Sequence, residues 1–89
     1  MRDSRQWSVQ IFVGEADGHT YAEAALCDDI GNRVRGTGHA RLSPGDYDVP
    51  EIGDEIAVAR ALQDLSNRLL KVAADDVEAL THEHVVLHS

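Results

Sequence analysis

The segment RVRGTGHAR, residues 33–41, decides how this chain folds. Its residues alternate with a period of two, which is the side-chain period of a β-strand. The basic side chains all fall on one face, whereas the other face is nearly bare at Gly36 and Gly38. Bare backbone on the inner face of a sheet lets another element approach closely. The segment therefore predicts a strand on which a further element packs directly.

That element is the segment EIGDEIAVARALQDLSNRLLKVAADD, residues 51–76, which contains no helix breaker after its start. Apolar side chains recur in it at spacings of four and three, as on one face of a helix. They are Val58, Leu62, Leu65, Leu69 and Val72, with Ile56 and Ala61 widening the stripe. We predict an amphipathic helix of about five turns. Arg60, Asp64 and Arg68 form an i, i+4 ladder expected on its solvent face.

Two further strands precede residue 33. QWSVQIFVGE, residues 6–15, alternates strictly, and its apolar side chains predict one buried face. These side chains are Trp7, Val9, Ile11 and Val13. Asp17-Gly18 marks a hairpin turn, and TYAEAALC, residues 20–27, is the returning strand. Its alanines also fit a helix, but the flanking turns and the short length favour a strand.

The predicted fold class is α+β, with a three-stranded antiparallel sheet (β-β-β) followed by one long α-helix packed on it. Asp75 and Glu78 fit a capping box, which predicts a short C-terminal helix over residues 77–81. The tail HEHVVLHS, residues 82–89, is either a strand or loose. All 89 residues are expected to form a single domain.

Composition limits the setting of the protein. The formal net charge is -8, and residues 43–89 carry most of it, with ten acidic residues against three basic ones. An acidic half of this kind repels nucleic acid unless a basic patch overrides it. Cys27 is the only cysteine, so no intrachain disulfide forms. The absence of a signal-peptide pattern and of a membrane-spanning run predicts a cytoplasmic protein without a membrane partner.

Two motifs, GTGHARLSP (36–44) and VPEIGDEIAVARALQDLSNRLLKVAADDVEAL (49–80), together with the QW-x-V start of the first strand, resemble a family of small actinobacterial proteins of unknown function. The likeness spans nearly the whole chain. It implies a fold like the double-stranded-RNA-binding domain and dimeric, cytosolic proteins associated with stress or dormancy. A β-β-β-α core is also shared by ribosome-hibernation factors, which is an analogy of fold alone. The family has no established functional residues to transfer.

The sequence departs from RNA-binding members of that fold in its charge. Modules that bind double-stranded RNA place basic residues near helix ends and loops. Here the segment around the helix start is acidic, at Asp46, Asp48, Glu51, Asp54 and Glu55. This acidic segment and the net charge of -8 therefore disfavour direct nucleic-acid binding.

The candidate binding face is the basic side of the third strand with aromatic neighbours on the same side of the sheet. Its residues are Arg33, Arg35, His39, Arg41, Phe12 and Tyr21. Three interpretations remain open. The face is a solvated surface on which Glu23 pairs with Arg35, a protein interface, or a nucleic-acid contact with stacked bases.

Other chemistry is weakly indicated. GTGHAR lacks the third glycine of a phosphate-binding loop and continues as a strand. His82, His84 and His88 with Glu83 form the one metal-like cluster, but a titratable tail explains them better than a zinc site. A Cys27 pair with His19 or His39 is a remote alternative. We see no catalytic constellation and predict no enzyme, cofactor or metal.

Two function hypotheses follow. The first is a binding module that docks on ribosomes or other RNA–protein assemblies in a stress or dormancy response. The second is a homodimeric interaction module without a nucleic-acid role. The formal charge of -8 favours this second hypothesis. The homodimer itself is indicated by a helix stripe with more large side chains than a sheet rich in alanine and glycine covers.

Overall fold

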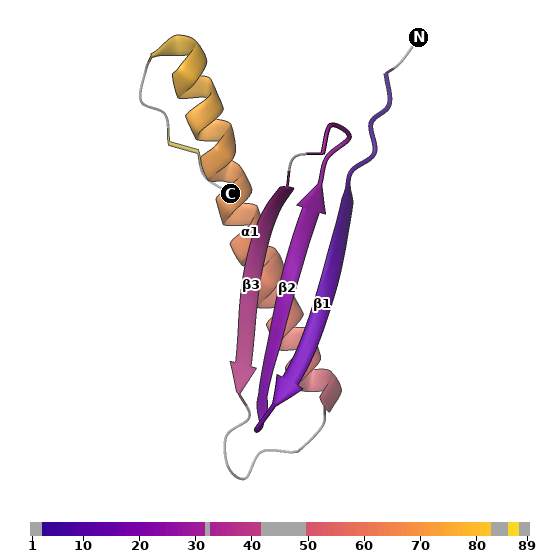
Figure 1. The fold of residues 1–89 in the computed structure, drawn as a ribbon. Helices are drawn as coiled ribbons and strands as arrows, with labels where there is room; N and C mark the ends of the chain where they lie inside the picture. The colour runs from indigo at the N-terminus through magenta and orange to yellow at the C-terminus, as the bar shows by residue number, and fades with distance from the viewer. Residues whose placement is uncertain (1–2, 32, 42–49, 83–85, 88–89) are drawn as a thin grey trace.

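The computed structural model describes residues 3–31, 33–41, 50–82 and 86–87. These residues form three strands, β1 (Ser8–Ala16), β2 (His19–Cys27) and β3 (Arg33–Arg41), and one helix, α1 (Pro50–Thr81). The strands make one antiparallel sheet in the order β1-β2-β3, and α1 lies across one face of it (Figure 1). The predicted α+β class and strand order are confirmed, and β2 is a strand rather than the competing helix.

Tight turns set the register of the sheet. Asp17 (φ 52°) and Gly18 (φ 75°) both have positive φ, the geometry of a two-residue type I′ hairpin turn. Ala16 therefore pairs with His19, and Val9, Ile11 and Val13 pair with Leu26, Ala24 and Ala22. Before β3, the Asp28 carboxylate accepts a hydrogen bond from the Ile30 N–H at 3.0 Å.

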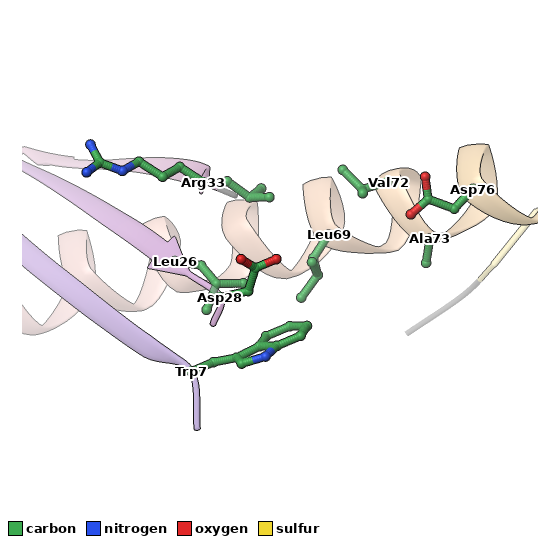
Figure 2. A pocket seen from close by; sticks show the side chains of 9 residues that line it. Trp7, Leu26, Asp28, Arg33, Leu69, Val72, Ala73 and Asp76 are labelled. Atoms are coloured by element: carbon green, nitrogen blue, oxygen red, sulfur yellow. The ribbon is translucent and has the colours of Figure 1, made fainter. Parts of the chain in front are cut away.

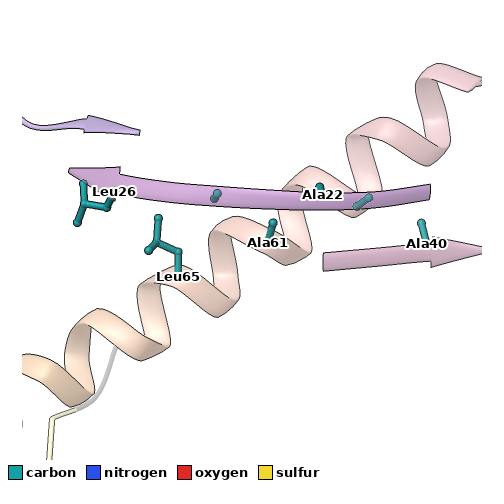
Figure 3. Close-up of a cluster of buried hydrophobic side chains, with 7 residues drawn as sticks. Ala22, Leu26, Ala40, Ala61 and Leu65 are labelled. Atoms are coloured by element: carbon teal, nitrogen blue, oxygen red, sulfur yellow. The ribbon is translucent and has the colours of Figure 1, made fainter. Parts of the chain in front are cut away.

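The helix sits on the backbone of β3 at the two glycines. A Cβ on Gly36 would collide with the backbone of Leu65 and Ala61, and one on Gly38 with the backbone of Ala57 and Ala61. Helix and strand thus approach more closely than any side chain would permit. Small residues dominate the core beneath (Figure 3), which consists of Ala22, Ala24, Leu26, Ala40, Ala57, Ala61 and Leu65.

The predicted burial of β1 is wrong for the chain alone. Every residue of β1 is exposed, including Val9, Ile11 and Val13 on the side that faces α1. The helix packs mainly on β3 and β2 and barely touches β1, crossing the sheet diagonally (Figure 1). A helix about 10 Å wide covers only about two strands spaced about 4.8 Å apart, so the third strand keeps its apolar face open.

The prediction of a separate short helix at 77–81 is also wrong, because α1 continues without interruption through Asp75 and Asp76 to Thr81. Lys71 pairs with Asp75 at 3.2 Å, one turn further along the helix. Asp75 thus supports the helix from within instead of capping a new one. At about 1.5 Å per residue α1 is far longer than the strands, and its last turns project beyond the sheet (Figure 1).

Candidate binding surfaces of the sheet

The outer face of the sheet, which points away from α1, gathers all six predicted site residues. The antiparallel register aligns Phe12 with Glu23 and Thr37, and Tyr21 with Gly14 and His39. Arg33, Arg35 and Arg41 follow the same side of β3 and are all exposed. The juxtaposition predicted from the period-two pattern is therefore confirmed; whether this face binds a ligand stays a prediction.

One of the three arginines is partly neutralised. Arg35 Nη1 lies 3.7 Å from Glu23 Oε1 on the neighbouring strand, the cross-strand pair expected for a solvated face. Both side chains are well exposed, so this pair contributes little to stability. Arg33 and Arg41 form no ion pair with any other residue that the structure describes. Two fixed positive charges therefore remain available at opposite ends of β3.

A cluster of three rings lies at the Arg41 end of this face. His19 Nδ1 and His39 Nε2 are hydrogen-bonded at 2.8 Å, and their ring planes are within 15° of parallel with centroids 5.0 Å apart. The Tyr21 ring stacks on His39, again with centroids 5.0 Å apart. His19 was absent from the predicted site, although it is two residues from Tyr21 and therefore on the same face. Cys27 lies at the other end of β2, so the structure contradicts its pairing with either histidine.

A shallow hollow of about 410 Å³ adjoins the ring cluster. Phe12 and Tyr21 flank it, with exposures of 58% and 51%. Its floor includes Gly14, where a Cβ would meet nothing within 4 Å. Two aromatic rings thus stand beside an open stretch of backbone, an arrangement in which a planar group can stack.

Polar side chains of α1 cover part of the free edge of β3. The backbone N–H of Thr37 donates to Asp64 Oδ2 at 2.8 Å, and Arg60 Nη1 donates to the His39 carbonyl at 2.7 Å. Two hydrogen bonds hold the pKa of Asp64 below its ordinary value. The larger effect comes from the Thr37 backbone N–H and the next from the Arg68 side chain. Asp64 and Arg60 thus form hydrogen bonds to the edge of β3. Of the ladder predicted on the solvent face of the helix, the Arg68–Asp64 ion pair is present at 3.1 Å.

The apolar groove is a second surface, on the side of the sheet that carries α1. We use this name for exposed apolar side chains of α1, of β1 on the side that faces α1, and of Trp7 just before β1. Its large exposed side chains are Trp7 (50%), Val9 (43%), Ile11 (38%), Val13 (45%), Leu62 (41%) and Val72 (41%). At the Trp7 end, where sheet and helix diverge, lies a pocket of about 590 Å³ (Figure 2). Apolar residues such as Trp7, Leu69 and Val72 line it together with the charged residues Asp28, Arg33 and Asp76.

No other chemistry gathers in the described part of the chain. Residues 3–31, 33–41, 50–82 and 86–87 hold no group of three or more metal-ligating side chains. The tail histidines His84 and His88 and Glu83 lie outside the described residues. No described helix is long and apolar enough to cross a membrane.

This chain is similar to known proteins in sequence and in fold. A family model described as Rv2632c-like matches residues 5–86, which include the sheet and the helix. The chain belongs to the Rv2632c-like family. An uncharacterised protein of Mycobacterium bovis, Mb1767, is 51% identical over 79 residues, which are 89% of this chain and 83% of that protein. The uncharacterised protein Rv2632c of Mycobacterium tuberculosis is 44% identical over 77 residues, which are 86% of this chain and 82% of that protein.

The crystal structure of Rv2632c shares the fold. Its TM-score with this chain is 0.82 at 40% identity, and the match covers 92% of this chain and 96% of that one. The predicted membership of an actinobacterial family of unknown function is thus confirmed. The Rv2632c-like relatives are uncharacterised, so function rests on the surfaces described above.

Proposed function

We propose that this Rv2632c-like protein is a non-enzymatic, cytoplasmic binding module that docks its outer sheet face on the RNA of an RNA–protein assembly, such as a ribosome, in a stress or dormancy response. The observation that carries the proposal is the segregation of charge. The outer face holds three arginines and one glutamate, a net charge of +2, so the remainder of this chain of -8 carries -10.

Segregated charge of this kind orients a protein on its partner. A positive face attracts phosphate, and the strongly negative remainder is repelled from it. The exposed rings of Phe12 and Tyr21 add stacking surface to the same face. The acidic α1 side then faces solvent or protein, which fits an assembly containing both protein and RNA better than naked duplex RNA.

Co-sedimentation with ribosomes at two salt concentrations tests the proposal. Wild type is expected to sediment with ribosomes at low salt and to be released at high salt. The double variant Arg33→Ala/Arg41→Ala should lose co-sedimentation. The matched control Arg68→Ala/Lys71→Ala removes the same charge from the helix and should retain it. Equal loss in both variants, or no wild-type sedimentation at low salt, would refute docking through the outer face.

The apolar groove favours a second candidate, a homodimeric interaction module. Six large apolar side chains of β1, its N-terminal flank and α1 are exposed, and no further helix or strand in the described part of the chain covers them. A second copy offers the same stripe and the same helix flank, and a two-fold interface requires such a self-complementary surface. Because the groove is on the helix side, a dimer formed there leaves both outer faces free, so the two candidates are compatible.

Neighbouring residues on opposite faces of β1 test the dimer. Ile11 lies in the groove and Phe12 on the outer face. Ile11→Glu is expected to reduce the mass measured by light scattering from dimer to monomer, whereas Phe12→Glu should leave it unchanged. A monomeric wild type at micromolar concentration would exclude the dimer.

A further inference from the structure

The outer face is not uniform, because its Arg41 end combines a ring hollow with hydrogen-bonding groups. Arg41 is the direct cross-strand partner of His19, and His39 is that of Tyr21. The hydrogen-bonded histidine pair therefore stands between the fixed charge of Arg41 and the exposed Tyr21 ring. Gly14 continues the row beyond Tyr21 and leaves the far side of that ring open.

The His19–His39 hydrogen bond restricts what the pair presents to a ligand. A bond between two imidazole nitrogens needs one N–H and one lone pair. When both rings are neutral, the remaining two nitrogens are one donor and one acceptor. When the pair takes up one proton, the internal bond remains and both outward nitrogens, His19 Nε2 and His39 Nδ1, become donors. A phosphate oxygen only accepts hydrogen bonds, so it selects the singly protonated pair.

From this geometry we infer that the His19–His39 pair, Arg41 and Tyr21 form a nucleotide subsite for single-stranded RNA that takes up one proton when it binds. The phosphodiester lies at Arg41 and the histidine pair, and the base stacks in the hollow between Tyr21 and Phe12. This inference deepens, and rests on, the proposed docking of the outer face on RNA. It specifies single-stranded RNA because only an unstacked base reaches the hollow.

The charged groups near the pair come from several elements. On β3, Arg41 is the cross-strand partner of His19 and supplies a fixed positive charge for the phosphate. The other charged groups nearby are Asp17 in the turn before His19, Glu23 on β2, which pairs with Arg35, and Arg60 of α1, which donates to the His39 carbonyl. The β1 residues aligned with this end, Gly14 and Ala16, are uncharged.

The direct test measures affinity for a labelled single-stranded oligoribonucleotide by fluorescence anisotropy between pH 5.5 and 8 at constant ionic strength. Imidazole is the side chain that titrates in this range. Wild-type affinity is expected to rise as the pH falls, by up to about tenfold per pH unit, the limit for one linked proton. Calorimetry in two buffers of different ionisation enthalpy should report an uptake of up to one proton per site.

His39→Gln keeps a polar side chain but removes the titrating pair, so it should bind RNA with a flat pH profile. His82→Gln, at the end of α1, is the matched control and should retain the wild-type slope; far-ultraviolet circular dichroism confirms the fold of both. RNA binding with the same pH profile in wild type and His39→Gln would overturn the subsite and leave the docking proposal intact. No RNA binding at any pH would refute both.

Competition with inorganic phosphate separates the sources of the anion. Weak competition at millimolar phosphate is expected, because free phosphate lacks the base. If inorganic phosphate binds with the same proton uptake but RNA does not bind, the residues form an anion site and its assignment to RNA is wrong. Tyr21→Leu should weaken the affinity for RNA severalfold and leave the affinity for inorganic phosphate unchanged. An equal loss of the two affinities would exclude stacking of the base in the hollow.

Discussion

Asp64 of α1 accepts a hydrogen bond from the backbone N–H of Thr37 at the open edge of β3, with an N–O distance of 2.8 Å. An edge strand with unpaired backbone groups is a template for association with another chain. Asp64 and Arg60 occupy one donor and one acceptor of this edge from above. The β3 edge is therefore protected in its middle.

The Asp64 contact makes stability depend on pH in the acid range. Its pKa is lowered in the folded protein, so the carboxylate is favoured by folding. The stabilisation by the Asp64 carboxylate is therefore complete above its unfolded pKa of about 4, and it is lost as the pH falls through the lowered pKa of the folded protein. Asp64→Ala should be less stable than wild type at pH 7, with the difference shrinking below about pH 4. Urea denaturation from pH 3 to pH 7 measures this; a pH-independent difference would contradict it.

Gly38→Ala should destabilise the fold by about 1–3 kcal/mol or more, because the added methyl group meets helix backbone that has no rotamer with which to move aside. Gly14→Ala is the matched control, since its Cβ meets nothing within 4 Å, and it should change little. Thermal unfolding of both variants compares them. Equal midpoints would show that the helix does not rest on β3 as described.

Leu65→Ala should cost about 2–4 kcal/mol, since Leu65 is one of two large side chains in the buried core and is only 5% exposed. Leu62, one turn earlier and 41% exposed, lies in the apolar groove. Leu62→Ala should have a small effect on monomer stability and a larger one on dimerisation. The free energy of unfolding at several protein concentrations separates the two effects.

Trp7 provides an intrinsic probe of the groove, because it is the only tryptophan and is 50% exposed in the single chain. If a second copy covers the groove, dilution should shift its emission to longer wavelength as the dimer dissociates. The Ile11→Glu variant should show the long-wavelength emission at every concentration. An emission maximum independent of concentration in both proteins would indicate that Trp7 stays outside the interface.

The arrangement of the sheet was predictable from local signals. Asp17-Gly18 fixes the hairpin, and the period of two places Phe12, Tyr21 and Arg35 on one face. Gly36 and Gly38 indicate the close approach of the helix. Each of these signals depends on a few neighbouring residues or on strand alternation, so it can be interpreted without knowledge of the tertiary structure.

What failed depended on tertiary relationships. Alternation shows that β1 has an apolar side but does not reveal what covers it, so Val9 and Ile11 were expected to be buried. The direction in which α1 crosses the sheet brings Asp64 to Thr37, and no sequence spacing encodes that angle. The His19–His39 bond required the exact register of β2 and β3, which follows only once the intervening turn is known.

The contact of α1 with the glycines of β3 has a calorimetric consequence. Where a helix rests on backbone and alanine methyl groups, folding removes little hydrocarbon from water. The heat-capacity change of unfolding depends on that hydrocarbon, so the isolated chain should fall below the usual value of about 12–15 cal/mol/K per residue. The stability curve of the isolated chain is then shallow and broad, so its free energy of unfolding changes little with temperature.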